Sequence, residues 1–246
     1  MGEAIAVLSG KGGTGKTSAC AALGCALSEL GKSVLCVDLD VGLRNLDIAL
    51  AMADEPAIAF SEADPDSPLA LQAARHPRFG NLYLLTAPAF DPAEGIDEAA
   101  FLRLLARGRE EFDFVLLDAP AGLGEFFRLA ARDAGRVLLV SGADPASLRD
   151  ASRTAEVLEL MGKTRVRLIV NRVNEKLYGK MNLTVDDVMD GVGLPLLGVI
   201  PEDRNVPLSA AFGVPLLLRS RRGAAAACRR MARRLLGLRA PLAARL

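Results

Sequence analysis

The sequence lacks tryptophan, and only 4% of its 246 residues are aromatic. Filling of the core therefore falls to alanine, leucine and valine, side chains that suit helices packed on a parallel sheet. The sequence holds a single histidine, His76, in the run R-H-P-R-F. A lone imidazole does not make a metal site, so we expect His76 to lie in a surface loop.

Long apolar runs are missing as well, and none reaches the roughly 18 residues that a membrane-spanning helix needs. The start of the chain, M-G-E-A-I-A-V, carries an early acid and lacks the basic residues of a secretory signal. Four cysteines occur in apolar contexts without the spacing of metal ligands, at positions Cys20, Cys25, Cys36 and Cys228. We expect them to be reduced core thiols in a cytoplasmic protein.

Acidic residues end at Asp203. All 30 of them lie at or before this position, together with 20 lysines and arginines, whereas residues 204–246 contain ten arginines and no acid. Such a split suggests a basic C-terminal segment that faces an anionic surface. The alternative is a solvated helix face without a partner.

The chain has enough apolar residues for a large core, because 51% of it is hydrophobic and 24% is charged. Short apolar runs predict strands over residues 4–9, 33–38, 81–85, 114–118, 136–141, 165–171 and 196–200. Helical spacing predicts helices over residues 18–30, 96–107, 146–161, 184–192 and 224–238. This alternation predicts a doubly wound, mainly parallel α/β sheet flanked by helices in three layers. We predict one domain over residues 1–238, with an irregular excursion at 53–68 and a short basic tail at 239–246.

Residues 10–17 read G-K-G-G-T-G-K-T, a full match to the phosphate-loop pattern, between a predicted strand and a predicted helix. The glycines let backbone N–H groups converge on a polyphosphate at the helix start. The predicted nucleotide contacts are Gly10, Lys11, Gly12, Gly13, Thr14, Gly15, Lys16, Thr17 and Ser18. Lys16 is the candidate for the β/γ oxygens, and the Thr17 hydroxyl for Mg²⁺. The stretch also spells a dinucleotide-type G-x-G-x-x-G, but that pattern does not explain Lys16 and Thr17.

Acids end two of the predicted strands. Asp38 and Asp40 lie two residues apart, so on an extended segment they point the same way. We assign Asp40 to orienting the attacking water and Asp38 to the water shell of the metal; helix capping is the alternative for either. Asp118 follows four apolar residues in F-V-L-L-D, the Walker B pattern, and is the candidate to hold Mg²⁺ through water. The loop 120–122 behind it can sense the γ-phosphate.

The predicted base pocket lies farther along the chain. Asn171 ends the strand R-L-I-V-N, and its amide can pair with adenine as donor and acceptor. The other candidates for this pocket are Arg172, Pro201, Glu202 and Asp203.

The second lysine of the loop, Lys11, makes K-G-G-T-G-K-T resemble the deviant Walker A of the ParA/MinD ATPase family. This resemblance implies an ATP-sandwiched homodimer in which Lys11 reaches the partner's phosphates and acts as a catalytic cation with Lys16 and Asp40. A lysine that acts only in cis is the alternative. The run G-L-R-N-L-D-I-A-L resembles the MinD branch, where Asn45 would make contacts across the dimer. In this group an Asn and a Pro-Glu-Asp run frame the adenine.

The resemblance covers nearly the whole chain apart from residues 53–80. It implies a slow Mg²⁺-dependent ATPase that cycles between ATP and ADP and helps to place the division septum. The implied partners are a MinC-type division inhibitor, a MinE-like activator or other topological factor, and anionic lipid on the inner face of the cell membrane. The tail 239–246 is short for a membrane anchor. The alternative is a ParA-like or flagellar-number-type ATPase that acts on DNA or another cargo, with DNA the less expected partner.

Overall fold

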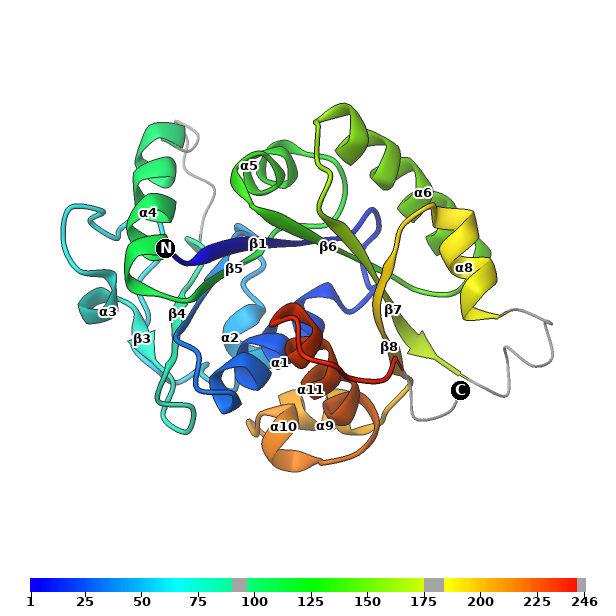
Figure 1. Ribbon diagram of the computed structural model, residues 1–246. Helices are drawn as coiled ribbons and strands as arrows, with labels where there is room; N and C mark the ends of the chain where they lie inside the picture. Colours follow the sequence, from blue (N-terminus) through cyan, green and yellow to red (C-terminus); the bar gives the residue numbers. More distant parts are fainter. Residues whose placement is uncertain (90–96, 175–183, 243–246) are drawn as a thin grey trace.

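The fold is described by a computed structural model that covers residues 1–89, 97–174 and 184–242. Its strands form one sheet in the order β3-β4-β2-β5-β1-β6-β7-β8 (Figure 1), parallel except for β3. Their bounds are β1 (Glu3–Leu8), β2 (Val34–Asp38), β3 (Ala74–Arg75), β4 (Leu82–Leu85), β5 (Phe114–Asp118), β6 (Arg136–Ser141), β7 (Val166–Val173) and β8 (Leu196–Pro201). The predicted fold class is confirmed.

Helices cover both faces of the sheet, as the three layers of Figure 1 show. One face carries α4 (Glu98–Glu111), α5 (Glu125–Asp133), α6 (Pro145–Leu160) and α8 (Val185–Val192). The other carries α1 (Lys16–Glu29), α2 (Leu46–Leu50), α9 (Asn205–Ala211), α10 (Leu216–Arg219) and α11 (Gly223–Leu235). In the described part of the chain, no helix is long and apolar enough to cross a bilayer.

The strand side chains divide between two cores because alternate residues point to opposite faces. In β1, Ala4, Ala6 and Leu8 join the core under α4–α6, whereas Ile5 and Val7 join the core under α1 and α11. All five are 1% exposed or less. A strand buried on both faces has no polar alternation, which is why these strands read as continuous apolar runs in the sequence.

Several short elements were not predicted from the sequence: β3, α2, α3 (Leu69–Gln72), α5, α9 and α10. Apart from α5, each has seven residues or fewer and thus too few turns to show a helical or strand period. The predicted helices exist, and their ends are shifted by up to four residues. The helix predicted at 96–107 begins at residue 96, which lies outside the described part of the chain. Residues 243–246 of the predicted tail also lie outside it.

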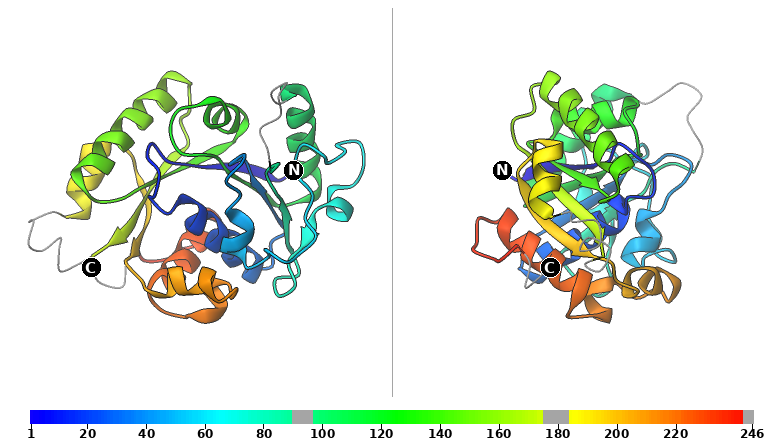
Figure 2. Two further views of the ribbon diagram at one scale, coloured as in Figure 1. Left: turned by 180° about the vertical axis from the view of Figure 1, so that it is seen from behind. Right: turned by 90° about the vertical axis from the view of Figure 1, so that its right-hand side faces the viewer.

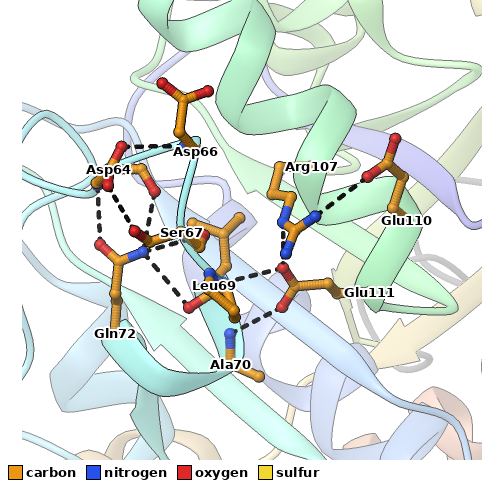
Figure 3. Close-up of polar contacts among 10 residues, drawn as sticks. Asp64, Asp66, Ser67, Leu69, Ala70, Gln72, Arg107, Glu110 and Glu111 are labelled. Atoms are coloured by element: carbon orange, nitrogen blue, oxygen red, sulfur yellow. Dashed lines mark hydrogen bonds and ion pairs between the residues drawn. The ribbon is translucent and has the colours of Figure 1, made fainter.

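The excursion at 53–68 is more ordered than we predicted. Phe60 is buried in the core, and its ring packs edge-on against Phe101 of α4 at 5.9 Å between centroids. Glu111, also on α4, accepts hydrogen bonds from the backbone N–H groups of Leu69 and Ala70, both at 3.0 Å (Figure 3). Because the carboxylate satisfies free donors in the first turn of α3, it ties the excursion to the domain.

The prediction that His76 lies in a surface loop is wrong: only 2% of the residue is exposed. Its Nδ1 accepts hydrogen bonds from the N–H groups of Arg78 and Phe79, and its Nε2 lies 2.9 Å from the Leu50 carbonyl oxygen. These bonds require a neutral ring with the proton on Nε2, and burial lowers its pKa. The imidazole thus joins the end of α2 to the β3–β4 turn.

Candidate functional site

The phosphate loop lies at the carboxyl edge of the parallel strands, between β1 and α1. Gly15 precedes α1 with φ of 83°, a left-handed conformation that favours glycine. Within the described chain no side chain caps this helix, and its first turn holds no acid. Free N–H groups and the positive end of the helix dipole therefore point into the loop, the arrangement that binds phosphate.

Glycine at position 15 is also required by the close approach of Asn171. A Cβ at position 15 would lie 2.2 Å from Asn171 Nδ2, far inside contact distance. Asn171 is buried and donates from Nδ2 to the Thr14 carbonyl oxygen at 2.7 Å. The predicted base-pocket residue therefore lies against the phosphate loop and supports its backbone.

Lys16 and Asp118 form a buried ion pair, with Lys16 Nζ at 2.6 Å from Asp118 Oδ1. Their side chains are 6% and 1% exposed. Burial raises the pKa of Asp118 above its ordinary value, although the Lys16 ammonium opposes this effect. The same Nζ lies 3.4 Å from the Thr17 hydroxyl, so the three predicted residues are close together.

Asp38 is placed beside Asp118 by the pairing of β2 with β5, in which these two residues are direct partners. Its Oδ1 accepts a hydrogen bond from the N–H of Asp40 at 2.9 Å, and its Oδ2 accepts from Asn45 and Leu46 at 3.2 and 3.0 Å. Burial first, and then the charge of Asp118, raises the pKa of Asp38 to about 6. Asp38 thus holds the loop from Asp40 to the start of α2, a capping role of the kind that the sequence left open.

Asp40 differs from Asp38 in its surroundings. It is partly exposed, and its charge contributes to the raised pKa of Asp118, which places it near the loop. Its backbone carbonyl accepts hydrogen bonds from Leu43 and Arg44, so its side chain lies at a tight turn. Asn45, which follows this turn, lines one cavity together with Thr17 and Ser18 of α1.

The residues present fit a magnesium ion. Asp118 Oδ2 is buried and has no hydrogen-bond partner within the described residues, and the Thr17 hydroxyl lies near the same ion pair. The described chain has no cluster of three or more His, Cys, Asp or Glu that could hold a metal. Mg²⁺ does not require one, because it keeps several waters and binds through one or two protein groups together with substrate phosphates.

A cavity of about 510 Å³ opens beside the phosphate loop at the ends of β7 and β8. The predicted residues Asn171, Arg172, Pro201, Glu202 and Asp203 all line it, together with Gly15 and Ser18. Both Asp203 carboxylate oxygens are engaged, Oδ1 by the N–H of Asn205 and Oδ2 by the N–H of Ala224 at 3.0 Å. Asp203 therefore fixes the starts of α9 and α11 around the cavity.

The backbone of β7 is strained at this cavity. Arg172 has φ of 57°, which is unusual for a residue other than glycine, and the pairing of β7 with β8 shifts register between Val170 and Val173. The irregularity lies directly after Asn171. Local strain of this kind is maintained where the surrounding structure aims a side chain at a site.

Lys11 is exposed and lines a second cavity of about 280 Å³, between the phosphate loop and the loop after β6. Asp144 lies across this cavity. Its pKa is lowered first by the hydrogen bond from the Ser147 hydroxyl and further by the charge of Lys11. No ion pair joins Lys11 to any described residue.

Sequence reasoning missed residues that line the base cavity from outside the predicted motifs. Val206 and Pro207 reach it from α9, and Cys228 reaches it from α11. All four cysteines are free and buried, as predicted. Pro207, in the first turn of α9, was the available signal that a helix begins just after Asp203, at Asn205.

The comparisons with known proteins agree on one family. Residues 5–216 match the CobQ/CobB/MinD/ParA nucleotide binding domain. The septum site-determining protein MinD of Synechocystis sp. is 34% identical over 89% of this chain and 83% of its own length. A structure of the Aquifex aeolicus MinC:MinD cell division protein complex matches with a TM-score of 0.87, 32% identity and 98% coverage of both chains. The Pyrococcus horikoshii septum site-determining protein MinD complexed with Mg-ADP matches with a TM-score of 0.77, 28% identity and 96% coverage of both chains.

Proposed function

Because the chain belongs to the CobQ/CobB/MinD/ParA nucleotide-binding family, we propose that it is a MinD-type ATPase that hydrolyses ATP slowly in a dimer. The observation that carries this proposal is the buried ion pair between Lys16 of the phosphate loop and Asp118 at the end of β5. Each member has a predicted partner on the substrate side, phosphate oxygens for Lys16 and hydrated Mg²⁺ for Asp118. Binding of Mg-ATP would separate Lys16 from Asp118, and each side chain would contact its substrate-side partner instead.

In the proposed reaction, backbone N–H groups of Gly12 to Lys16 hold the phosphates, and Lys16 neutralises charge on the β/γ oxygens. Thr17 and, through water, Asp118 would hold Mg²⁺, which when bound neutralises charge that develops on the phosphates. Asp40 orients the attacking water. Asp38 positions Asp40, because its Oδ1 accepts a hydrogen bond from the backbone N–H of Asp40.

Lys11 is proposed to act on the partner's phosphates. In support of this role, its side chain is exposed and unpaired among the described residues, free to reach a second molecule. Apolar side chains also flank the site: Leu43 after β2 is 70% exposed, and Leu123 after β5 is 38% exposed. A dimer formed over the carboxyl edge of the sheet would remove both from water.

Partner binding and membrane association complete the proposal. The likeness to a MinD chain in complex with MinC supports a MinC-type division inhibitor as partner. A MinE-like activator or other topological factor and anionic lipid are proposed from the family alone. Residues 1–238 would form the ATPase domain and residues 239–246 a basic tail. The likeness of 32–37% to MinD proteins favours this function over the DNA-binding alternative.

The mass of the Asp40→Ala variant in solution tests the proposal. Without the water-orienting carboxylate, the variant should stay in the ATP state, so we expect a dimer with Mg-ATP and a monomer with Mg-ADP. Asp54→Ala, which removes an exposed carboxylate that lines none of the cavities beside the loop, should turn over ATP at the wild-type rate. A monomer of Asp40→Ala in both nucleotides would mean that Lys11 acts in cis, and the dimer mechanism would be rejected.

A further inference from the structure

A cationic groove lies at the amino-terminal ends of β6, β7 and β8, at the edge of the sheet opposite to the phosphate loop. It is a cavity of about 380 Å³ lined by the starts of these strands and the end of α11. Four of its lining residues are arginines, Arg136, Arg165, Arg167 and Arg234, and we call this cavity the arginine groove. The right-hand view of Figure 2 shows the start of the chain and the red end of α11 on the same side of the molecule.

In the arginine groove, guanidinium groups outnumber the carboxylates that pair with them among the described residues. Glu3 lies 3.0 Å from Arg136 and 3.0 Å from Arg165, so one carboxylate serves two guanidinium groups. Arg167 and Arg234 form no ion pair with any residue that the structure describes. Arg234 instead donates to the Leu197 carbonyl oxygen at 2.7 Å, which holds its guanidinium at the groove.

Burial, with repulsion from neighbouring arginines as a smaller cause, lowers the pKa of two of these arginines. Burial, followed by the charges of Arg165 and Arg167, lowers the pKa of Arg136 against the opposing effect of Glu3. Burial and the charge of Arg167 likewise lower the pKa of Arg234. A bound anion would relieve this repulsion, and the planar guanidinium fork matches the oxygens of a phosphate group.

Exposed leucines lie close in the chain to lining residues of the arginine groove. Leu160, at the end of α6, is 88% exposed and lies four residues before Thr164, which lines the groove. Leu238 is 45% exposed and follows Gly237, another lining residue; Leu242 beyond it is 43% exposed. Cations beside exposed aliphatic side chains suit a membrane surface, where headgroup phosphate and acyl chains adjoin. The phosphates of duplex DNA would leave these leucines without a contact.

We propose that the arginine groove binds the phosphate of an anionic lipid headgroup, with Arg167 as its main unpaired cation. This inference rests on the proposed membrane association and adds a headgroup site built into the folded domain. The neighbouring leucines would enter the acyl boundary. The tail 239–246 would then need to supply only part of the attachment, which suits its short length.

Arg167→Glu is the test variant, because Arg167 is exposed and its replacement breaks no ion pair among the described residues. Arg103→Glu, on the exposed face of α4, makes the same change in net charge away from the groove and is the matched control. The probe is dihexanoyl-phosphatidylglycerol below its micellar concentration, titrated calorimetrically into the full chain. We expect saturable binding that Arg167→Glu weakens at least about tenfold, the effect of losing one charge-assisted hydrogen bond, and that Arg103→Glu leaves unchanged.

Three results would overturn the headgroup site: wild-type affinity in Arg167→Glu, equal affinity for inorganic phosphate, or displacement of the lipid by a duplex oligonucleotide at physiological salt. Sedimentation with phosphatidylglycerol vesicles separates this site from the proposed function. A chain that binds the soluble lipid without pelleting would refute membrane association and retain the site. If wild type and Arg167→Glu pellet equally, membrane association stands and the groove is not its site.

Discussion

Replacing Lys16 by methionine should destabilise the nucleotide-free protein strongly, because it leaves the Asp118 carboxylate buried without its partner. The pair is 2.6 Å apart, and its side chains are 6% and 1% exposed. Removal of one member of a buried ion pair costs about 3–5 kcal/mol of the free energy of unfolding. With a urea dependence of about 2–3 kcal/mol per molar, this corresponds to a fall of roughly 1–2.5 M in the unfolding midpoint.

The cost should also depend on pH. Burial already raises the pKa of Asp118 with Lys16 in place, and loss of the ammonium raises it further. A carboxyl group whose pKa is higher in the folded state stabilises the folded protein fully at pH values below its unfolded-state pKa, about 3.9. This stabilisation is lost as the pH rises through the folded-state pKa. The difference between wild type and Lys16→Met should therefore be larger at pH 8 than at pH 5.

Urea titrations followed by far-UV circular dichroism measure both effects, since the chain has no tryptophan. Lys32→Met is the matched control, because Lys32 lies 3.5 Å from Asp113 in a pair whose side chains are 38% and 43% exposed. It should cost less than about 1 kcal/mol. Equal midpoints for the two variants, or a Lys16→Met cost that does not change between pH 5 and pH 8, would refute the reasoning.

Three further predictions concern other parts of the molecule. Gly15→Ala should lower the free energy of unfolding in urea by about 2–3 kcal/mol, because of left-handed backbone strain and displacement of Asn171. Gly12→Ala, which has open space at its Cβ, should cost less than half of that, and equal costs would contradict this prediction. His76 has a pKa lowered by burial, so wild-type stability should fall as the pH drops below about 6.5, and His76→Gln should abolish this part of the pH dependence; an unchanged pH profile would argue against the buried neutral ring. All four buried thiols should resist a thiol reagent in the native protein and react within the mixing time in urea, and rapid native labelling would disprove their burial.

The sequence by itself determined the fold class and the phosphate loop. The loop is eight contiguous residues whose glycines and lysines specify a backbone shape and a ligand chemistry locally, so no distant contact is needed to recognise it. The parallel strands were readable because burial on both faces removes polar residues from every position. Asp118 was readable for the same reason, as the first acid after such a run.

Only the tertiary structure decided contacts between residues far apart in the chain. Lys16 and Asp118 are 102 positions apart, and their pairing depends on the order in which β1 and β5 enter the sheet. Asp38 became a backbone acceptor because α2 starts beside it, and His76 was buried because the end of α2 packs on its turn. The arginine groove gathers residues from β6, β7 and α11, whose separate positions carry no local pattern. A periodicity or motif depends on residues that are neighbours along the chain. Charge balance, burial and strain depend on which strands and helices pack against one another.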